Sequence, residues 1–193
     1  MDLVVLFRKA VEEFARRVEA VGADQWTAPT PDTEWDVRAL VNHIVVEGLW
    51  APPLLQGMTI AEVGDRFDGD QLGDDPLAAW QGASSAAVEA VGQDGVLDRI
   101  VHVSFGDIPG REYVSQLTCD HLIHGWDLAR AIGADERLDR DVVDFAYEFL
   151  SPQADSWRGA GVFGPRVELP AGADRQSELL ALTGRRAQST AGG

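Results

Sequence analysis

The pattern of apolar and polar residues along the chain predicts several amphipathic helices. In the first segment, apolar side chains recur at spacings of three and four residues from Leu3 to Val21, and Gly22 follows the last of them. Such a period places the apolar side chains on one face of a helix, and glycine commonly follows a helix end. The sequence therefore predicts a first helix over residues 3–21.

A second helix is predicted after a turn-rich link. Thr33 and Asp36 lie three residues apart, a loose form of the arrangement that caps the start of a helix. The apolar period then continues to about Trp50, where Pro52 and Pro53 follow. Because proline lacks an amide donor and clashes with the preceding turn, we expect the helix to kink or end there.

Two more long helices are bounded by proline and glycine. Asp75 and Pro76 open the third, which ends at Gly92. The fourth covers residues 111–132 and is followed by Gly133. Four long amphipathic helices joined by modest connections are typical of a helix bundle.

The remaining segments are shorter or irregular. In the stretch RIVHVSFGDIPG, apolar residues alternate with polar ones, which indicates a short strand that enters a turn before the fourth helix. After the fourth helix, DRDVVDFAYEFL predicts a helix that begins at Asp139 and stops before Pro152. The segment that follows is irregular, and SELLALT predicts a short last helix closed by Gly184.

These elements predict an all-α fold with one main domain. Residues 1–135 would form a four-helix bundle with a short strand or hairpin before its fourth helix. Residues 136–186 would form a small helical and irregular appendage packed on the bundle, and residues 187–193 a flexible tail.

Composition narrows the class of function. The 193 residues carry a formal net charge of −16, which repels phosphate backbones and anionic lipids, so we expect neither nucleic acid nor membrane as a partner. A homodimer is compatible with this charge. No stretch approaches the about 20 apolar residues that span a bilayer, and the charged first segment is unlike a signal peptide. A single cysteine, Cys119, excludes an internal disulfide framework and a thiolate-rich zinc cluster, and we expect a cytoplasmic protein.

The fourth predicted helix carries the densest group of reactive side chains, CDHLIHGWD at residues 119–127. Each helical residue advances about 100° around the axis, so His124 lies about 40° from Asp120, near the centre of the apolar stripe. His121 also points inward, at about 100°, whereas Trp126 points elsewhere. Asp120 and His124 share one face at a spacing that lets two side chains hold one metal ion. The alternative is a core histidine hydrogen-bonded to a neighbouring carboxylate.

The second predicted helix supplies a third candidate. His43 lies on the apolar stripe of that helix, so it also points into the core. Facing helices of a bundle lie about 8–10 Å apart, so His43, Asp120 and His124 can meet at one ion. Two histidines and one carboxylate with an open position suit a divalent metal, zinc first, with nickel or iron as alternatives.

Neighbouring side chains leave the ligand set open. Glu47, four residues after the histidine, could be a fourth ligand, could hold an imidazole from outside, or could lie at the helix edge, which we favour. His121 is an alternative to Asp120, since both cannot easily bind the same ion as His124 with good geometry. Of the two we prefer the carboxylate. Asp127 could orient the site from outside or pair with Arg130.

The stretches APTPDTEWDVRALVNHIV and DHLIHGWDLARAIG together resemble the metal-binding DinB-like family related to mycothiol-dependent maleylpyruvate isomerase. The ending ELLALTGRR resembles a subgroup of that family, and the likeness spans nearly the whole chain. The resemblance implies a four-helix bundle with one metal between the second and fourth helices, held by His43, Asp120 and His124. It also implies a low-molecular-weight thiol such as mycothiol at the open metal position, with its pKa lowered by the ion.

The leading hypothesis is therefore an enzyme that uses a divalent metal and a thiol to isomerise or conjugate a small electrophile. The isomerase has a separate carboxy-terminal domain for which this chain leaves few residues, so a related reaction is expected rather than the same one. A metal- or ligand-binding module without turnover and a hydrolase that activates bound water are the alternatives.

Overall fold

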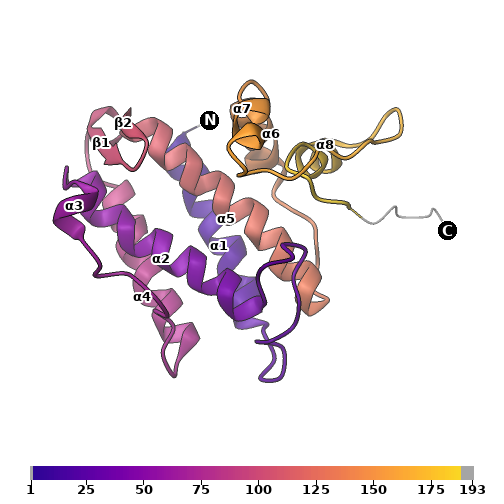
Figure 1. Ribbon diagram of the computed structural model, residues 1–193, viewed down its shortest axis with the longest axis horizontal. Coiled ribbons are helices and arrows are strands. Elements are labelled where there is room, and N and C mark those ends of the chain that lie inside the picture. Colours follow the sequence, from indigo (N-terminus) through magenta and orange to yellow (C-terminus); the bar gives the residue numbers. More distant parts are fainter. Residues whose placement is uncertain (1, 188–193) are drawn as a thin grey trace. The chain divides into compact units, whose positions relative to one another are not determined.

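A computed structural model describes residues 2–187 of the chain, which divide into two compact units (Figure 1). The first unit ends at Arg137 and the second begins at Leu138. That the second packs on the first stays a prediction, and the predicted tail, residues 187–193, lies outside the described part except for its first residue. Within that part, no helix combines the length and the apolar character of a bilayer span.

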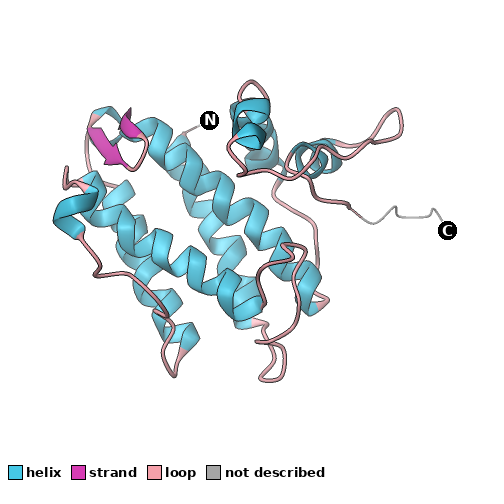
Figure 2. Ribbon diagram, viewed as in Figure 1, coloured by secondary structure: helices cyan, strands magenta, loops and turns pink. Residues whose placement is uncertain are grey.

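The first unit is built from the four long helices that the apolar period predicts (Figure 2). These are α1 Leu3–Glu19, α2 Val37–Leu55, α4 Pro76–Val91 and α5 Gly110–Ile132; the shorter elements are α3 Ile60–Val63, the 3₁₀ helix η1 Val96–Asp98 and the strands β1 Ile100–Val103 and β2 Gly106–Pro109. Helix α1 packs on α4 and α5, and α2 packs on the same two helices, so their apolar faces share one core. The prediction of an all-α fold with a short hairpin before the last long helix is confirmed.

Local signals fix the ends of these helices. The carboxylate of Asp36 accepts a hydrogen bond from the amide of Ala39 at 2.8 Å, and Asp75 accepts one from Ala78 at 3.0 Å. Such caps satisfy amides that have no partner inside the helix and are each worth about 1 kcal/mol. Helix α5 ends at Gly133, whose φ of 71° lies in the left-handed region that glycine adopts most readily. The start of α2 is thereby fixed by a residue seven positions before His43.

Helix α2 continues one turn beyond the predicted stop. Pro52 and Pro53 lie inside it, and the helix ends only at Leu55. Leu54 and Leu55 are 3 % and 1 % exposed, so the free energy of burying them offsets the two amide hydrogen bonds that the prolines cannot make. Of the two outcomes expected at the prolines, a kink or an end, the end does not occur there, because tertiary packing outweighs the local cost.

Helix α5 is buried almost all round, and not along one stripe only. It packs against α1, α2, η1 and the hairpin. Trp126, which the angular argument directs away from the core, is 1 % exposed, and the guanidinium of Arg130 lies 4.4 Å from the centre of its ring. Cys119 is 2 % exposed, and burial raises the pKa of its thiol well above the usual value, so it is not a thiolate at neutral pH.

The hairpin is joined closely to the start of α5. Strands β1 and β2 are antiparallel, with Val101 opposite Ile108. The amide of Gly110 donates to the carbonyl oxygen of Arg99 at 2.7 Å, and a side chain at position 110 would clash with the carbonyl oxygen of Val96. Glycine at this position lets the hairpin lie against the first turn of α5.

Among its described residues, the second unit contains three helices. They are α6 Arg140–Leu150, α7 Ala154–Gly159 and α8 Arg175–Leu182. Helix α6 packs on α8, and its first amides are capped by Asp139 as the sequence predicts. The predicted irregular segment contains α7, which is too short to display an apolar period and has no side-chain cap.

Candidate metal centre

The three predicted ligands converge in the first unit. His43 comes from α2, and Asp120 and His124 lie one turn apart on α5. One potential ligand atom of each residue lies within 4.8 Å of the other two. Nε2 of His43 is 3.8 Å from Oδ2 of Asp120, and the ring centres of His43 and His124 are 5.1 Å apart. Asp120 and His124 therefore face the same point between α2 and α5 as His43, which is distant from them in the sequence.

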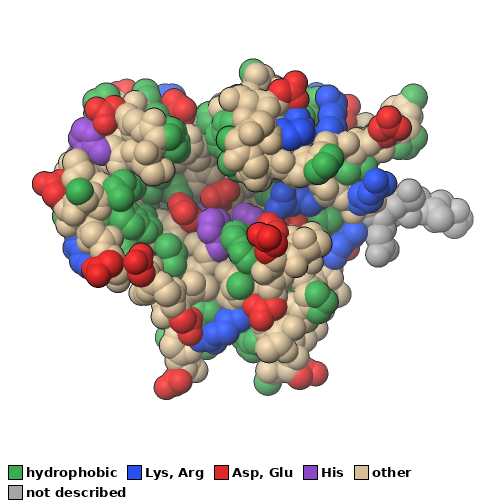
Figure 3. All heavy atoms as spheres, viewed as in Figure 1, with side chains coloured by type: hydrophobic (Ala, Val, Ile, Leu, Met, Phe, Trp, Pro, Cys, Tyr) green, Lys and Arg blue, Asp and Glu red, His purple; other side chains and the backbone are tan. Residues whose placement is uncertain are grey.

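This group can be reached from solvent on one side. The side chains of His43 and Asp120 are 26 % and 38 % exposed, whereas that of His124 is 10 % exposed. Figure 3 shows histidine and acidic side chains together near the centre of the face that α2 and α5 present. An ion or a small reactant can therefore approach without unfolding the helices.

His124 is held by a carboxylate behind it. Its Nδ1 lies 3.1 Å from Oδ2 of Asp127, and Asp127 is fully buried. A buried carboxylate is best satisfied when Nδ1 carries the proton, which leaves the lone pair on Nε2. This contact is the one expected if Asp127 orients the site from outside the ligand set.

Trp35 packs against the two histidines, a contact that the apolar period of the sequence does not predict. The centre of its ring lies 4.7 Å from that of His43 and 5.4 Å from that of His124. The carbonyl oxygen of Trp35 accepts hydrogen bonds from the amide and the hydroxyl of Thr30, at 3.3 Å and 2.9 Å, which fixes the loop. The sequence does show a tryptophan directly before the helix cap Asp36. Because this position lies outside the helix, the helical period does not indicate the direction of its side chain.

Charge within the group favours an ionised carboxylate. Burial raises the pKa of Asp120, but the hydrogen bond from His43 and the nearby imidazoles outweigh it, and the pKa is lowered overall. For His43 burial lowers the pKa, but Asp120, Glu47 and Asp32 together outweigh it and raise the pKa above 6.5. Without a metal, His43 and Asp120 therefore favour an ion pair, and a proton on His43 competes with a metal ion.

The alternative ligand His121 lies elsewhere in the core. Its ring packs edge-on against Phe7 and Phe14 of α1, with ring centres 5.5 Å and 6.0 Å away. Its Nδ1 donates to the carbonyl oxygen of Leu117 at 2.8 Å, and its buried Nε2 has no hydrogen-bond partner among the described residues. Burial lowers its pKa to about 4, so it is neutral at pH 7. His121 is a core residue and does not join the three-residue group.

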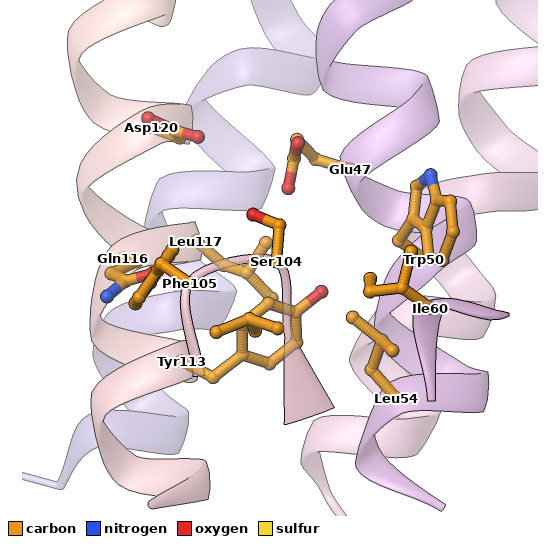
Figure 4. A pocket seen from close by; sticks show the side chains of 11 residues that line it. Glu47, Trp50, Leu54, Ile60, Ser104, Phe105, Tyr113, Gln116, Leu117 and Asp120 are labelled. Atoms are coloured by element: carbon orange, nitrogen blue, oxygen red, sulfur yellow. The ribbon is translucent and has the colours of Figure 1, made fainter. Parts of the chain in front are cut away.

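Glu47 borders a cavity next to the group. The cavity measures about 280 Å³ and is lined by α2, α3, the turn of the hairpin and α5, with Asp120 on its wall (Figure 4). Burial and the charge of Asp120 raise the pKa of Glu47 to about 7. Glu47 is not among the side chains that bring ligand atoms within 4.8 Å of one another in the described chain. The sequence favours a position of Glu47 at the helix edge, whereas in the structure its side chain borders the cavity.

Comparisons with known proteins agree with this fold. The family model described as "Mycothiol maleylpyruvate isomerase N-terminal domain" matches residues 7–129. Two uncharacterized proteins of Mycobacterium tuberculosis, from strains CDC 1551 / Oshkosh and ATCC 25618 / H37Rv, are 30 % identical to this chain over 96 % of its length and 98 % of theirs.

Two solved structures share the fold at low identity. The mycothiol-dependent maleylpyruvate isomerase aligns with a TM-score of 0.64 and 15 % identity, over 86 % of this chain and 75 % of its own. A histidine-to-alanine mutant of that isomerase aligns with a TM-score of 0.66 and 13 % identity, over the same shares. The aligned part is larger than the first unit alone. From the family match and the relatives that span its length, the chain belongs to the mycothiol maleylpyruvate isomerase N-terminal domain family.

Proposed function

We propose that this chain is a metal-dependent enzyme that uses a low-molecular-weight thiol of the mycothiol type to isomerise or conjugate a small electrophile. In this proposal His43, Asp120 and His124 hold one divalent ion. The observation that carries it is the convergence of three potential ligand atoms within 4.8 Å in a member of this family. The solved relatives are mycothiol-dependent isomerases by name, which supports a thiol as the second reactant.

The chemistry of the donor set fits a divalent ion. Two imidazole nitrogens and a carboxylate suit zinc, with nickel and iron as alternatives, and three protein ligands leave a position open for a reactant. Metal-binding histidines usually have an outer partner on the second ring nitrogen, and Asp127 supplies one for His124. When bound, the ion would lower the pKa of a coordinated thiol and so provide a thiolate near neutral pH.

Side chains around the ligands have separate tasks in this proposal. Trp35 lies against both imidazoles and keeps water from that side of them. Glu47 borders the cavity next to Asp120, and its pKa of about 7 lets it give or take a proton near neutral pH. The reactants would meet between the ligands and this cavity.

A spectroscopic titration tests the proposal. Cobalt(II)-loaded protein is expected to show a changed visible spectrum and a new sulfur-to-metal band when mycothiol is added, because a thiolate would enter the open position. The His43→Ala variant, treated in the same way, should not respond. If no cellular thiol perturbs the cobalt spectrum of the intact protein, the thiol-dependent enzyme is wrong. A binding module or a hydrolase that activates water would then be the better description.

The contact behind His124 gives a smaller, graded prediction. Asp127→Asn is expected to weaken zinc binding by about 10–100-fold, because the neutral amide oxygen accepts a weaker hydrogen bond from Nδ1 and stabilises the ring less than a carboxylate does. Zinc affinity is measured by competition with a chromophoric chelator. The matched control is Asp107→Asn, which alters the exposed Asp107–His102 pair on the hairpin, where the two atoms lie 2.6 Å apart. Equal effects of the two substitutions would contradict the role of Asp127.

A further inference from the structure

The cavity beside the metal ligands has the size of a small-molecule site. Its volume of about 280 Å³ is roughly that of nine water molecules. Most of its wall is apolar and comes from separate elements: Trp50 and Leu54 of α2, Ile60 of α3, Phe105 of the hairpin turn and Leu117 of α5. Asp120 lies on the same wall, so an occupant would be next to the proposed ion (Figure 4).

One polar group inside this cavity lacks a partner. Tyr113 is 5 % exposed, and its buried hydroxyl has no hydrogen-bond partner among the described residues. In Figure 4 its ring projects from α5 into the cavity, with the oxygen directed toward the side of α2 and α3. A buried polar group without a partner costs free energy, and an occupant that supplies an acceptor would remove that cost. Burial, with Glu47 and Asp120, raises the pKa of Tyr113 well above its usual value, so the hydroxyl keeps its proton.

The charges on the wall are all of one sign. Glu47 and Asp120 border the cavity, and no lysine or arginine is among the described residues that line it. The charge of a divalent ion would be offset by Asp120 and by a thiolate. A carboxylate on the reactant would therefore find no cation of its own and would face Glu47.

We propose that this cavity binds the electrophile, that the electrophile is an uncharged molecule with an apolar body, and that its carbonyl oxygen accepts a hydrogen bond from Tyr113. The proposal rests on the proposed function only in calling the occupant the electrophile of that reaction. Tyr113 is then a substrate-binding residue, and the missing positive charge makes the cavity select against carboxylic acids.

A pair of probes with the same carbon skeleton tests the charge preference. Dimethyl maleate is uncharged, whereas maleate carries two carboxylates. Binding of each is measured by ligand-observed NMR with metal-free protein, because a zinc ion without its thiolate would itself bind a carboxylate. Dimethyl maleate is expected to bind at least about tenfold more tightly than maleate. Equal affinities, or tighter binding of maleate, would overturn the inference.

The two tyrosines of the chain provide a matched test of the contact. Tyr113→Phe is expected to weaken dimethyl maleate binding by about five- to tenfold, the effect of one hydrogen bond, while Tyr147→Phe in the second unit leaves it unchanged. Tyr113→Phe should also raise the Tm by a few degrees, because it removes an unpaired buried hydroxyl. Unchanged binding, or a Tm lowered by several degrees, would show that the Tyr113 hydroxyl does not bind a ligand in the cavity.

These measurements separate the inference from the proposed function. Loss of the predicted probe preference, together with an intact cobalt–thiol signal, would reject the cavity assignment and leave the enzyme standing. The predicted preference without any cobalt–thiol signal would keep the cavity as a binding site and reject the thiol-dependent reaction.

Discussion

Replacement of His43 by alanine is expected to weaken zinc binding by about a thousandfold or more. Loss of an outer partner of a metal ligand typically costs 10–100-fold in affinity, so loss of a ligand itself should cost more. Of the three residues that converge in the described part of the chain, His43 is the one on α2, and without it Asp120 and His124 of α5 would bind the ion alone. The affinity is measured by chelator competition and the bound metal by elemental analysis.

A histidine of the same chain serves as the control. The side chain of His102 is 36 % exposed and pairs with Asp107 on the hairpin, so His102→Ala should keep the zinc affinity of the intact protein. His43 is partly exposed, so its replacement should change the thermal melt of the metal-free protein little. If the His43→Ala variant binds zinc as tightly as the intact protein, His43 is not a metal ligand.

Acidification is expected to destabilise the metal-free protein through His121. Its pKa is 6.5 in the unfolded chain and about 4 when folded, so below pH 6.5 the unfolded state binds a proton that the folded state excludes. The free energy of unfolding should therefore fall by about 3 kcal/mol from this residue between pH 6.5 and 4. The quantity to measure is urea unfolding at several pH values with a chelator present.

His43 acts with the opposite sign. Its pKa is raised on folding, so its contribution to stability is present below pH 6.5 and is lost as the pH rises through the folded value. Comparison with His121→Leu isolates the buried residue, because this variant keeps His43 and removes only the group that folding makes less basic. The stability of His121→Leu relative to the intact protein should increase as the pH falls from 6.5 to 4. A constant difference across that range would show that His121 does not titrate as its burial predicts.

The convergence of the three candidate ligands could be predicted because the spacing of residues along a helix determines the direction of their side chains. Asp120 and His124 are four residues apart on one helix, and His43 lies on the apolar stripe of another. The same argument could not separate His121 from them. The angle of a side chain around the axis of α5 indicates whether the side chain points inward, but it does not indicate which helix lies opposite. In the structure Phe7 and Phe14 of α1 pack against His121, whereas α2 lies opposite Asp120 and His124.

Features outside the helices were harder to predict. Trp35 and the hairpin turn take their positions from loop hydrogen bonds and from a close approach at Gly110, and neither follows a period. The extension of α2 through Pro52 and Pro53 depends on the burial of two leucines, which the sequence alone does not weigh against the prolines. Helix starts were accurate because an aspartate cap acts within three residues of itself.

The continuity of α5 restricts how this protein can diverge. Tyr113, Asp120, His124 and Asp127 lie on one uninterrupted helix. A residue inserted between the first two would turn Tyr113 by about 100° relative to the candidate ligands and move the cavity wall away from them. Descendants of this chain can therefore acquire new substrates by replacing side chains along α5, while changes in length are tolerated only where the loops and the hairpin turn form the rest of the wall.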